Sequence, residues 1–369
     1  MAAVRTAFDP AVHGFGFPNA FVDLLTSLPT GTAIQTKGRC GGMAFASLDY
    51  FSADRPAPRW ATNLYGAARV PPDGNWLADR IRKRLFDSFR ARSALKFVTW
   101  AVAPDDRFGP VDGVRSWTLD ELAKVVAAVD AGRPVPLGLV VARSVKDVGQ
   151  DHQVVAHGYE RVGDETHVLV TDSNSPGHEV TLQPEAGAWR ASNGPLWRGF
   201  FVQDYTAVRP VILTRTPARG DEPVGPGSTI ALSHVWTGFS LHGEHDLVTG
   251  VRRGTRASER WAVEPGSDAG TVTLRNVADG WYLASQAGTR SPTTGQQAVW
   301  LRAEPDDWRV EVDGGGAWTA GSRVRIVHAA TGVALHSHPH VVDGTGGQRE
   351  VTGFTGRDDN DWWTVLELS

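Results

Sequence analysis

Cys40 is the only cysteine of this 369-residue chain, and its surroundings suit a nucleophile. Two glycines follow it, and the run after them, Met43 to Ala53, is apolar at nearly every position. A helix that is apolar on every side is normally buried, so the run predicts a buried helix that begins near the cysteine. The dipole and free N–H groups at a helix N-terminus favour a thiolate. Two interpretations of Cys40 stay open, a nucleophile and a small buried hydrophobic residue.

A cysteine nucleophile needs a base and a third group that orients the base. His152 opens one predicted strand, HQVVAHGYERV, and Asp172 ends the next, THVLVTD, with a Gly-Asp turn between them. This pattern is typical of a β-hairpin. His157 competes for the role of base, because simple hairpin pairing places it almost opposite Asp172. A β-bulge would instead bring His152 to that carboxylate, and Asp151 is a second candidate for the orienting group.

The elements that must position these residues can be placed from hydrophobic spacing. Residues 54–74 are rich in proline and read as a loop, and a helix with an apolar stripe starts at Asn75. Thr118 and Glu121 have the T-x-x-E spacing of a capping box, which predicts that a further helix begins there. A buried strand is expected over residues 134–142. Helices and strands thus mix in the N-terminal part.

The character of the chain changes after residues 216–227, which combine Pro, Gly and charge and indicate a linker. We therefore expect one domain over 1–215 and another over 228–369. The second lacks helical periodicity and repeats one pattern three times, an alternating strand, a glycine turn, a second strand with a leucine and a closing Trp strand. Three such copies must pack together to bury a core. The pattern predicts a β-trefoil with three tryptophans in its core, Trp261, Trp308 and Trp363.

Three histidines, His336, His338 and His340, occupy alternate positions of the third repeat and share one strand face. Imidazole is a common metal ligand, so a metal site is one interpretation. No cysteine or carboxylate completes a familiar ligand spacing. Hydrogen bonding within turns and loops is the interpretation that we favour.

Composition excludes several function classes. The formal net charge of −4 gives no reason to expect nucleic acid or a membrane surface as partner. A single cysteine cannot form an internal disulfide, and the N-terminal residues have no continuous apolar stretch of the kind found in signal peptides. We therefore expect a cytoplasmic protein, with export by another route left open. No cofactor or metal is implied.

The N-terminal motifs resemble those of papain-like cysteine peptidases. DHQVVAHGYE followed by HVLVTDSNSPG is similar to the segments that carry the base and the orienting residue in that superfamily, and CGGMAFA is similar to the start of its nucleophile helix. The resemblance implies that Cys40 is the nucleophile, His152 the base and Asp172 the orienting group. It also implies that Gln35 helps the Cys40 N–H to stabilise an oxyanion.

The third C-terminal repeat resembles the MIR family through ALHSHPH, GQREVTGF and DDNDWWTVLE. That resemblance implies a β-trefoil that is not catalytic and binds a glycan or a protein ligand.

Together these observations predict an α+β papain-like domain followed by an all-β trefoil. The leading hypothesis is a cysteine hydrolase of the peptidase or amidase type, or an acyltransferase, acting on a peptide or protein substrate that the trefoil helps to bind. The alternative is a non-catalytic binding protein on a papain-like scaffold, whose trefoil recognises a glycan or a protein.

Overall fold

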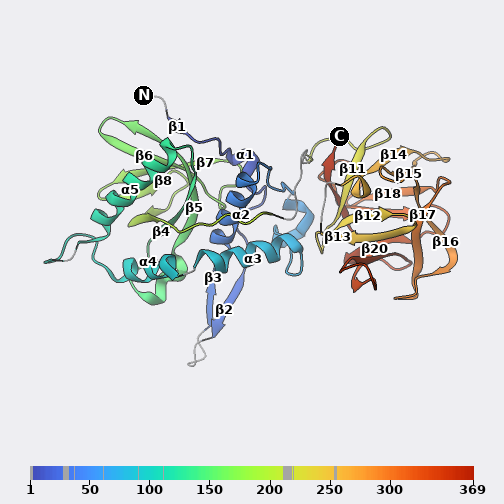
Figure 1. Cartoon of the computed structure of the whole chain (residues 1–369), viewed down its shortest axis with the longest axis horizontal. Helices are drawn as coiled ribbons and strands as arrows, with labels where there is room; N and C mark the ends of the chain where they lie inside the picture. The colour runs from blue at the N-terminus through green and yellow to red at the C-terminus, as the bar shows by residue number, and fades with distance from the viewer. Residues whose placement is uncertain are drawn as a thin grey trace. The chain divides into compact units, whose positions relative to one another are not determined.

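The computed structural model describes residues 3–27, 33–36, 38–60, 62–89, 91–110, 112–210, 218, 220–252 and 256–369. The chain forms two compact units (Figure 1), one from Met1–Ala57 with Asp79–Pro210 and one from Pro58–Ala78 with Val211–Ser369. The segment Pro58–Ala78 therefore belongs to the second unit, although residues of the first unit flank it in the sequence. The domain limits expected above, 1–215, 216–227 and 228–369, stay a prediction.

The first unit contains an eight-stranded sheet in the order β10-β4-β5-β6-β7-β8-β9, with β1 beside β5. Its strands are β1 (Val4–Arg5), β4 (Val135–Val140), β5 (His152–Val162), β6 (Glu165–Thr171), β7 (Glu179–Glu185), β8 (Ala188–Ala191), β9 (Leu196–Trp197) and β10 (Gly199–Val202). The predicted hairpin is present as β5 and β6, which pair antiparallel. Alternate residues of β5, Val154 and Ala156, pack in one core with Val168 and Val170 of β6. This packing fixes which face each strand residue occupies.

The first unit also contains the helices α1 (Pro10–His13), α2 (Cys40–Ser52), α4 (Ala91–Val102) and α5 (Val114–Asp130), and the short 3-10 turn η2 (Val145–Gln150). Helix α3 (Trp76–Ser88) begins at the end of the segment Pro58–Ala78 and continues in the first unit, whereas the 3-10 turn η1 (Thr62–Ala68) lies within that segment and so belongs to the second unit. Residues Gly41 to Tyr50 of α2 are all buried, as its apolar sequence predicts. A separate two-stranded pair is formed by β2 (Asp23–Ser27) and β3 (Ala33–Thr36). None of the described helices is long and apolar enough to cross a membrane.

The predicted capping box at Thr118 is wrong. Helix α5 begins one turn earlier, with Gly113 as the N-cap, and the Thr118 hydroxyl donates to the Val114 carbonyl within the helix. Glu121 does not reach back to the N-cap, because its carboxylate accepts from Lys96 and from Lys124. The motif failed because a Thr inside a helix can bond the carbonyl four residues before it.

The second unit is a β-trefoil, as predicted. Its twelve-stranded sheet contains β11 (Thr229–His234), β12 (Ser240–Glu244), β13 (Leu247–Val251), β14 (Trp261–Pro265), β15 (Thr271–Asn276), β16 (Tyr282–Arg290), β17 (Gln297–Arg302), β18 (Trp308–Val312), β19 (Val324–His328), β20 (Ala334–Val341), β21 (Arg349–Phe354) and β22 (Trp363–Leu368). Two further 3-10 turns are η3 (Ala257–Glu259) and η4 (Asp359–Asp361). Each repeat supplies four consecutive strands, and pairing of β11 with β22 closes the circle of repeats.

The trefoil core repeats one hydrogen bond three times. The indole Nε1 atoms of Trp261, Trp308 and Trp363 donate to the carbonyls of Leu241, Leu283 and Leu335, at 3.1, 2.9 and 2.9 Å. All three rings are fully buried in one core. Each closing strand is thus fixed to the leucine strand of its own repeat, which explains why the sequence places a Trp at the same point in every copy.

The first turn of each repeat is also equivalent. Gly238, Gly280 and Gly332 have φ values of 71°, 73° and 72°, a region that favours glycine. In the first repeat, this turn holds the segment Pro58–Ala78, because the Trp76 N–H donates to the Thr237 carbonyl at 2.8 Å and the Asn75 amide donates to the Val235 carbonyl at 3.1 Å.

Candidate functional site

Cys40 is the first residue of α2 and is partly exposed, whereas the rest of the helix start is buried. The helix follows Gly38, which has a φ of 115°, and Arg39, which is its N-cap. A Cβ at Gly41 would approach the amide of Gln153 to 2.4 Å, and one at Gly42 would approach the backbone of Ile81 to 2.0 Å. The two glycines therefore let the helix start pack against β5 and α3 without a steric clash.

His152 and Asp172 lie side by side at the ends of β5 and β6. Nε2 of His152 is 2.7 Å from Oδ1 of Asp172, and both side chains are buried. The register of the hairpin shifts between Ala156 and Gly158, so the bulge that would bring these two residues together is present. The sequence left open whether His152 or His157 faces Asp172, and the structure places His152 there.

Asp172 is held by further donors. Its Oδ1 accepts from the Asn174 N–H at 2.8 Å, and its Oδ2 accepts from the Asn193 amide at 2.8 Å. Trp197 stacks on the His152 ring with a centroid distance of 5.9 Å and an interplanar angle of 14°. The sequence reasoning missed Asn174, Asn193 and Trp197, because side chains that meet through tertiary contacts leave no local spacing pattern.

The Cys40 sulfur hydrogen-bonds the His152 ring. Cys40 and Asp172 together shift the pKa of His152 strongly. Burial of the ring lowers the pKa of His152, but the charges of Cys40 and Asp172 and the hydrogen bonds to them outweigh burial and raise that pKa to about 10. Burial alone would raise the pKa of Asp172, but the His152 charge and the N–H donors hold it below its ordinary value. Chemically, this arrangement stabilises a protonated His152 ring between Cys40 and Asp172.

The other candidates from the sequence are His157, Asp151 and Gln35. The first two make other contacts, and the side chain of Gln35 is not among the described residues. His157 stacks on Phe8 at 5.8 Å and burial lowers its pKa, so it is a core histidine. Asp151 accepts from the N–H groups of Val141 and Ala142 rather than orienting His152. Gln35 lies on β3, which pairs only with β2 among the described strands, and its side chain is outside the described residues. The oxyanion role of Gln35 therefore stays a prediction.

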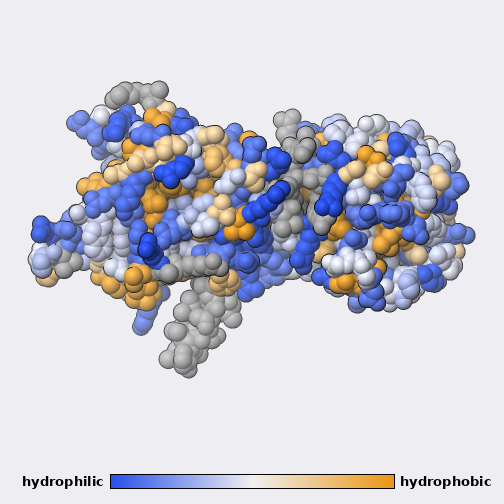
Figure 2. Space-filling model, in the orientation of Figure 1, coloured by the Kyte–Doolittle hydropathy of each residue, from blue (hydrophilic) through white to orange (hydrophobic). Residues whose placement is uncertain are grey.

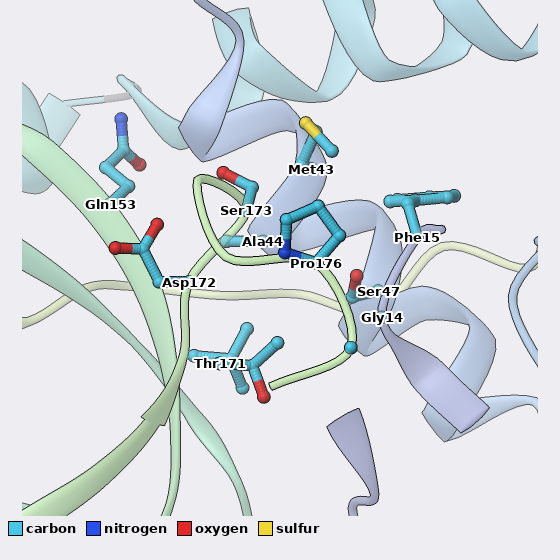
Figure 3. Close-up of a pocket in the computed structure, with 12 residues that line it drawn as sticks. Gly14, Phe15, Met43, Ala44, Ser47, Gln153, Thr171, Asp172, Ser173 and Pro176 are labelled. Atoms are coloured by element: carbon cyan, nitrogen blue, oxygen red, sulfur yellow. The ribbon is translucent and has the colours of Figure 1, made fainter. Parts of the chain in front are cut away.

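The space around this cluster is small. A cavity of about 40 Å³ is lined by Cys40, His152, Gln153 and Asp151, together with residues of α3, α4 and η2. A second cavity of about 20 Å³ is lined by Gln153, Asp172, Met43 and Ser47, among other residues (Figure 3). Ligand pockets for drug-sized molecules have volumes of about 300–1,000 Å³. Neither cavity has room for a peptide.

The histidines of the third trefoil repeat take part in turn hydrogen bonding. His336 Nδ1 lies 2.7 Å from Asp361, and His338 Nε2 lies 3.0 Å from Gln296 and from Thr352. His336, Asp358 and Asp361 form the set of possible metal ligands found among the described residues. Both carboxylates already accept backbone N–H groups of the η4 turn. The three histidines that the sequence suggested as metal ligands, His336, His338 and His340, therefore share only His336 with this set.

A larger pocket lies within the second unit. It has a volume of about 330 Å³ and is formed by the turn after β11, the residues around η4 and the segment before α3. We call it the Trp236 pocket, and it is lined by Leu64, Tyr65, Gly66, Ala68, Val70, Pro72, Val235, Trp236, Arg323, Asp359 and Trp362. Trp236 is 45% exposed, while Trp362 is buried beneath Arg323 and Arg325, whose guanidinium carbons lie 4.7 and 3.8 Å from its ring centroid.

Comparison with known proteins finds similarity to trefoil proteins. No protein-family model matches the chain. A stromal cell-derived factor 2-like protein of Arabidopsis thaliana is 29% identical over 170 residues, which cover 38% of this chain and 77% of that protein. The crystal structure of the SDF2-like protein from Arabidopsis thaliana is 26% identical with a TM-score of 0.38, covering 40% of this chain and 96% of that one. A Macrolepiota procera ricin B-like lectin in complex with lactose is 19% identical with a TM-score of 0.31, covering 39% and 98% of the two chains.

These findings overturn the leading hypothesis. The assignment to papain-like cysteine peptidases is wrong, and with it the expected hydrolase, because the curated relative that the chain matches is a stromal cell-derived factor 2-like protein. Short strings around a cysteine, a histidine and an aspartate reproduced the local geometry, but local geometry on a strand and a helix does not establish a function. The peptide substrate is unsupported for the same reason. The β-trefoil that the second resemblance implied agrees with the observed fold.

Proposed function

We propose that this chain is a non-catalytic binding protein and that its trefoil unit binds a carbohydrate in the Trp236 pocket. The observation that carries the proposal is the pocket itself, which at about 330 Å³ falls within the usual size range of small-molecule sites. The cavity beside Cys40, at about 40 Å³, falls far below it. The Trp236 pocket of the second unit is therefore a better candidate for a ligand site than the cavity beside Cys40.

The lining of the pocket suits a sugar ring. An exposed indole such as Trp236 offers a flat apolar face, against which the C–H groups of a pyranose can pack. Arg323 and Asp359 also line the pocket and offer a charged donor and a charged acceptor for hydroxyl groups. Sites of this kind combine an apolar surface with a few placed polar groups.

The walls of the pocket are held in place before any ligand binds. Arg323 is fixed by Asp313, whose carboxylate accepts from the guanidinium Nε at 2.8 Å. The Val235 N–H donates to the Trp362 carbonyl at 2.9 Å, which ties the turn that carries Trp236 to the η4 region. Preorganisation of this kind reduces the entropic cost of binding.

The face of the unit drawn in Figure 2 also favours a small polar ligand over a large apolar partner. On the face drawn in Figure 2, hydrophobic residues of the trefoil are scattered in small patches among hydrophilic ones. Obligate protein interfaces are larger and more apolar than this.

Saturation-transfer NMR of the full chain with a panel of neutral and acidic oligosaccharides tests the proposal. We expect a signal for at least one sugar, and we expect Trp236→Ala to abolish it. Trp281→Ala is the matched control, because Trp281 is 41% exposed on the second repeat and does not line the pocket. A panel without any binder, or equal binding by the wild type and Trp236→Ala, would contradict the proposal.

A further inference from the structure

We propose that Cys40 is a modification site, at which hydrogen peroxide or a similarly small peroxide oxidises a paired thiolate to a sulfenic acid. This inference concerns the first unit and does not depend on the proposed binding function. It requires no hydrolysis and no peptide substrate.

The first observation is the cluster that surrounds the sulfur. Cys40 opens a 13-residue helix, and its sulfur hydrogen-bonds the His152 ring, whose Nε2 is 2.7 Å from Asp172. The Asp172 carboxylate holds the His152 ring in place, and a cationic ring beside a cysteine favours the thiolate form. The thiolate is the form of cysteine that reacts with peroxides.

The second observation is an unpartnered acceptor at the same cavity. Gln153 is 2% exposed and lines the cavity with Cys40, yet its Oε1 accepts no hydrogen bond in the part of the chain that the structure describes. Buried polar atoms of native proteins normally have partners, so this oxygen points to an occupant that can donate. A peroxide O–H is such a donor.

Size restricts the occupant. A cavity needs about 10–15 Å³ to hold one water molecule. The cavity beside Cys40 offers about 40 Å³, which suits a molecule of two heavy atoms such as hydrogen peroxide. Larger electrophiles do not fit without movement of the surrounding side chains.

The chemical step balances with the groups present. The Cys40 thiolate attacks one peroxide oxygen, so that an S–O bond forms and the O–O bond breaks. The departing hydroxide takes the proton from the His152 imidazolium and leaves as water. The sulfur is oxidised by two electrons and the peroxide is reduced by two. Because Cys40 is the only cysteine of the chain, no second thiol of the same chain can convert the product to a disulfide.

Oxidation of the full chain by hydrogen peroxide, trapped with dimedone and followed by intact mass spectrometry, tests the inference. The titratable groups that interact with His152 are Cys40 of α2 and Asp172 after β6, and Asp151 before β5 lines the same cavity. We expect a rate constant that changes little between about pH 6 and about pH 8, because the proton already resides on His152 in this range. A wild-type rate that rises steadily with pH over this range would overturn the inference without any variant.

A pair of variants adds a second readout. His152→Gln should slow trapping roughly tenfold or more at neutral pH and make the rate rise with pH, because the thiol loses its cationic partner. His157→Gln is the matched control, since His157 is a buried histidine of the same strand that packs on Phe8. Equal trapping rates in His152→Gln and the wild type would also overturn the inference. A bulky reagent such as an N-aryl maleimide should react with the native chain more slowly than peroxide, relative to the unfolded chain.

Discussion

Nε2 of His152 and Oδ1 of Asp172 are 2.7 Å apart at the ends of neighbouring strands, and this contact depends on a bulge in the hairpin that joins them. The register shift between Ala156 and Gly158 places Val155 opposite Thr171, so that His152 and Asp172 fall on the same face of the hairpin. One irregular residue in β5 therefore brings together the two groups beside Cys40.

Asp172→Asn should lower the pKa of His152 and destabilise the first unit. The substitution keeps the shape of the side chain but removes the negative charge beside a buried imidazolium. Breaking a buried ion pair from one side costs about 3–5 kcal/mol. Urea denaturation and the NMR titration of the His152 ring measure the two effects. Asp151→Asn is the control, because the Asp151 carboxylate bonds backbone N–H groups instead of His152, and an equal fall of the His152 pKa in both variants would contradict the assignment.

The same pair predicts how stability changes at alkaline pH. The pKa of His152 rises from 6.5 to about 10 on folding, so the charged ring is favoured in the folded state. Its contribution to the free energy of unfolding is fully present below about pH 6.5 and is lost as the pH rises through about 10. Cys40→Ala removes one of the two negative partners, so the loss should move to lower pH. Denaturation curves of both proteins at several pH values check this, and coincident pH profiles would contradict it.

The trefoil unit should instead lose stability in acid. Burial lowers the pKa of His234 to about 3 and that of His338 to about 4, so both rings are neutral in the folded state. The unfolded chain binds protons at these residues below about pH 6.5, and stability is lost as the pH falls from there towards the folded values. Each unit of pKa difference corresponds to about 1.4 kcal/mol. Thermal unfolding of the full chain should show this loss, and His234→Gln should reduce its pH dependence. An unchanged slope in that variant would count against a neutral, buried His234.

Sequence patterns were sufficient to predict the fold where a repeat or a hydrophobic periodicity follows directly from the packing of the chain. The three Trp strands predicted the trefoil, because Trp261, Trp308 and Trp363 make the same hydrogen bond in every repeat. The apolar run after Cys40 predicted helix α2, because a helix without a polar face must be buried. His152 and Asp172 were placed together only as one of two alternatives, since the bulge that decides between them has no sequence signal of its own.

Patterns failed where distant segments meet. Nothing in residues 54–74, which read as a proline-rich loop, indicated that the segment Pro58–Ala78 belongs to the trefoil unit and lines the Trp236 pocket. The contacts that achieve this, such as the Asn75 amide to the Val235 carbonyl, join residues 160 positions apart.

The prediction of function was wrong for a related reason. A cysteine, a histidine and an aspartate in the expected order predicted a peptidase, whereas the cavity beside them has room for only a very small molecule.

Gly238 offers a test of how the trefoil holds the segment before α3. Gly238 and Gly280 occupy equivalent turns with φ values of 71° and 73°, so replacement by alanine strains both backbones equally. A Cβ at Gly280 meets open space, but one at Gly238 lies 2.8 Å from the Asn75 side chain, which bonds the Val235 carbonyl. Gly280→Ala should therefore cost about 1 kcal/mol, and Gly238→Ala should cost more. The difference between the two variants in urea denaturation isolates the contact with Asn75. If that contact positions one wall of the Trp236 pocket, Gly238→Ala should also weaken sugar binding while Gly280→Ala leaves it intact, and equal effects of the two substitutions would show that the segment is held by other contacts.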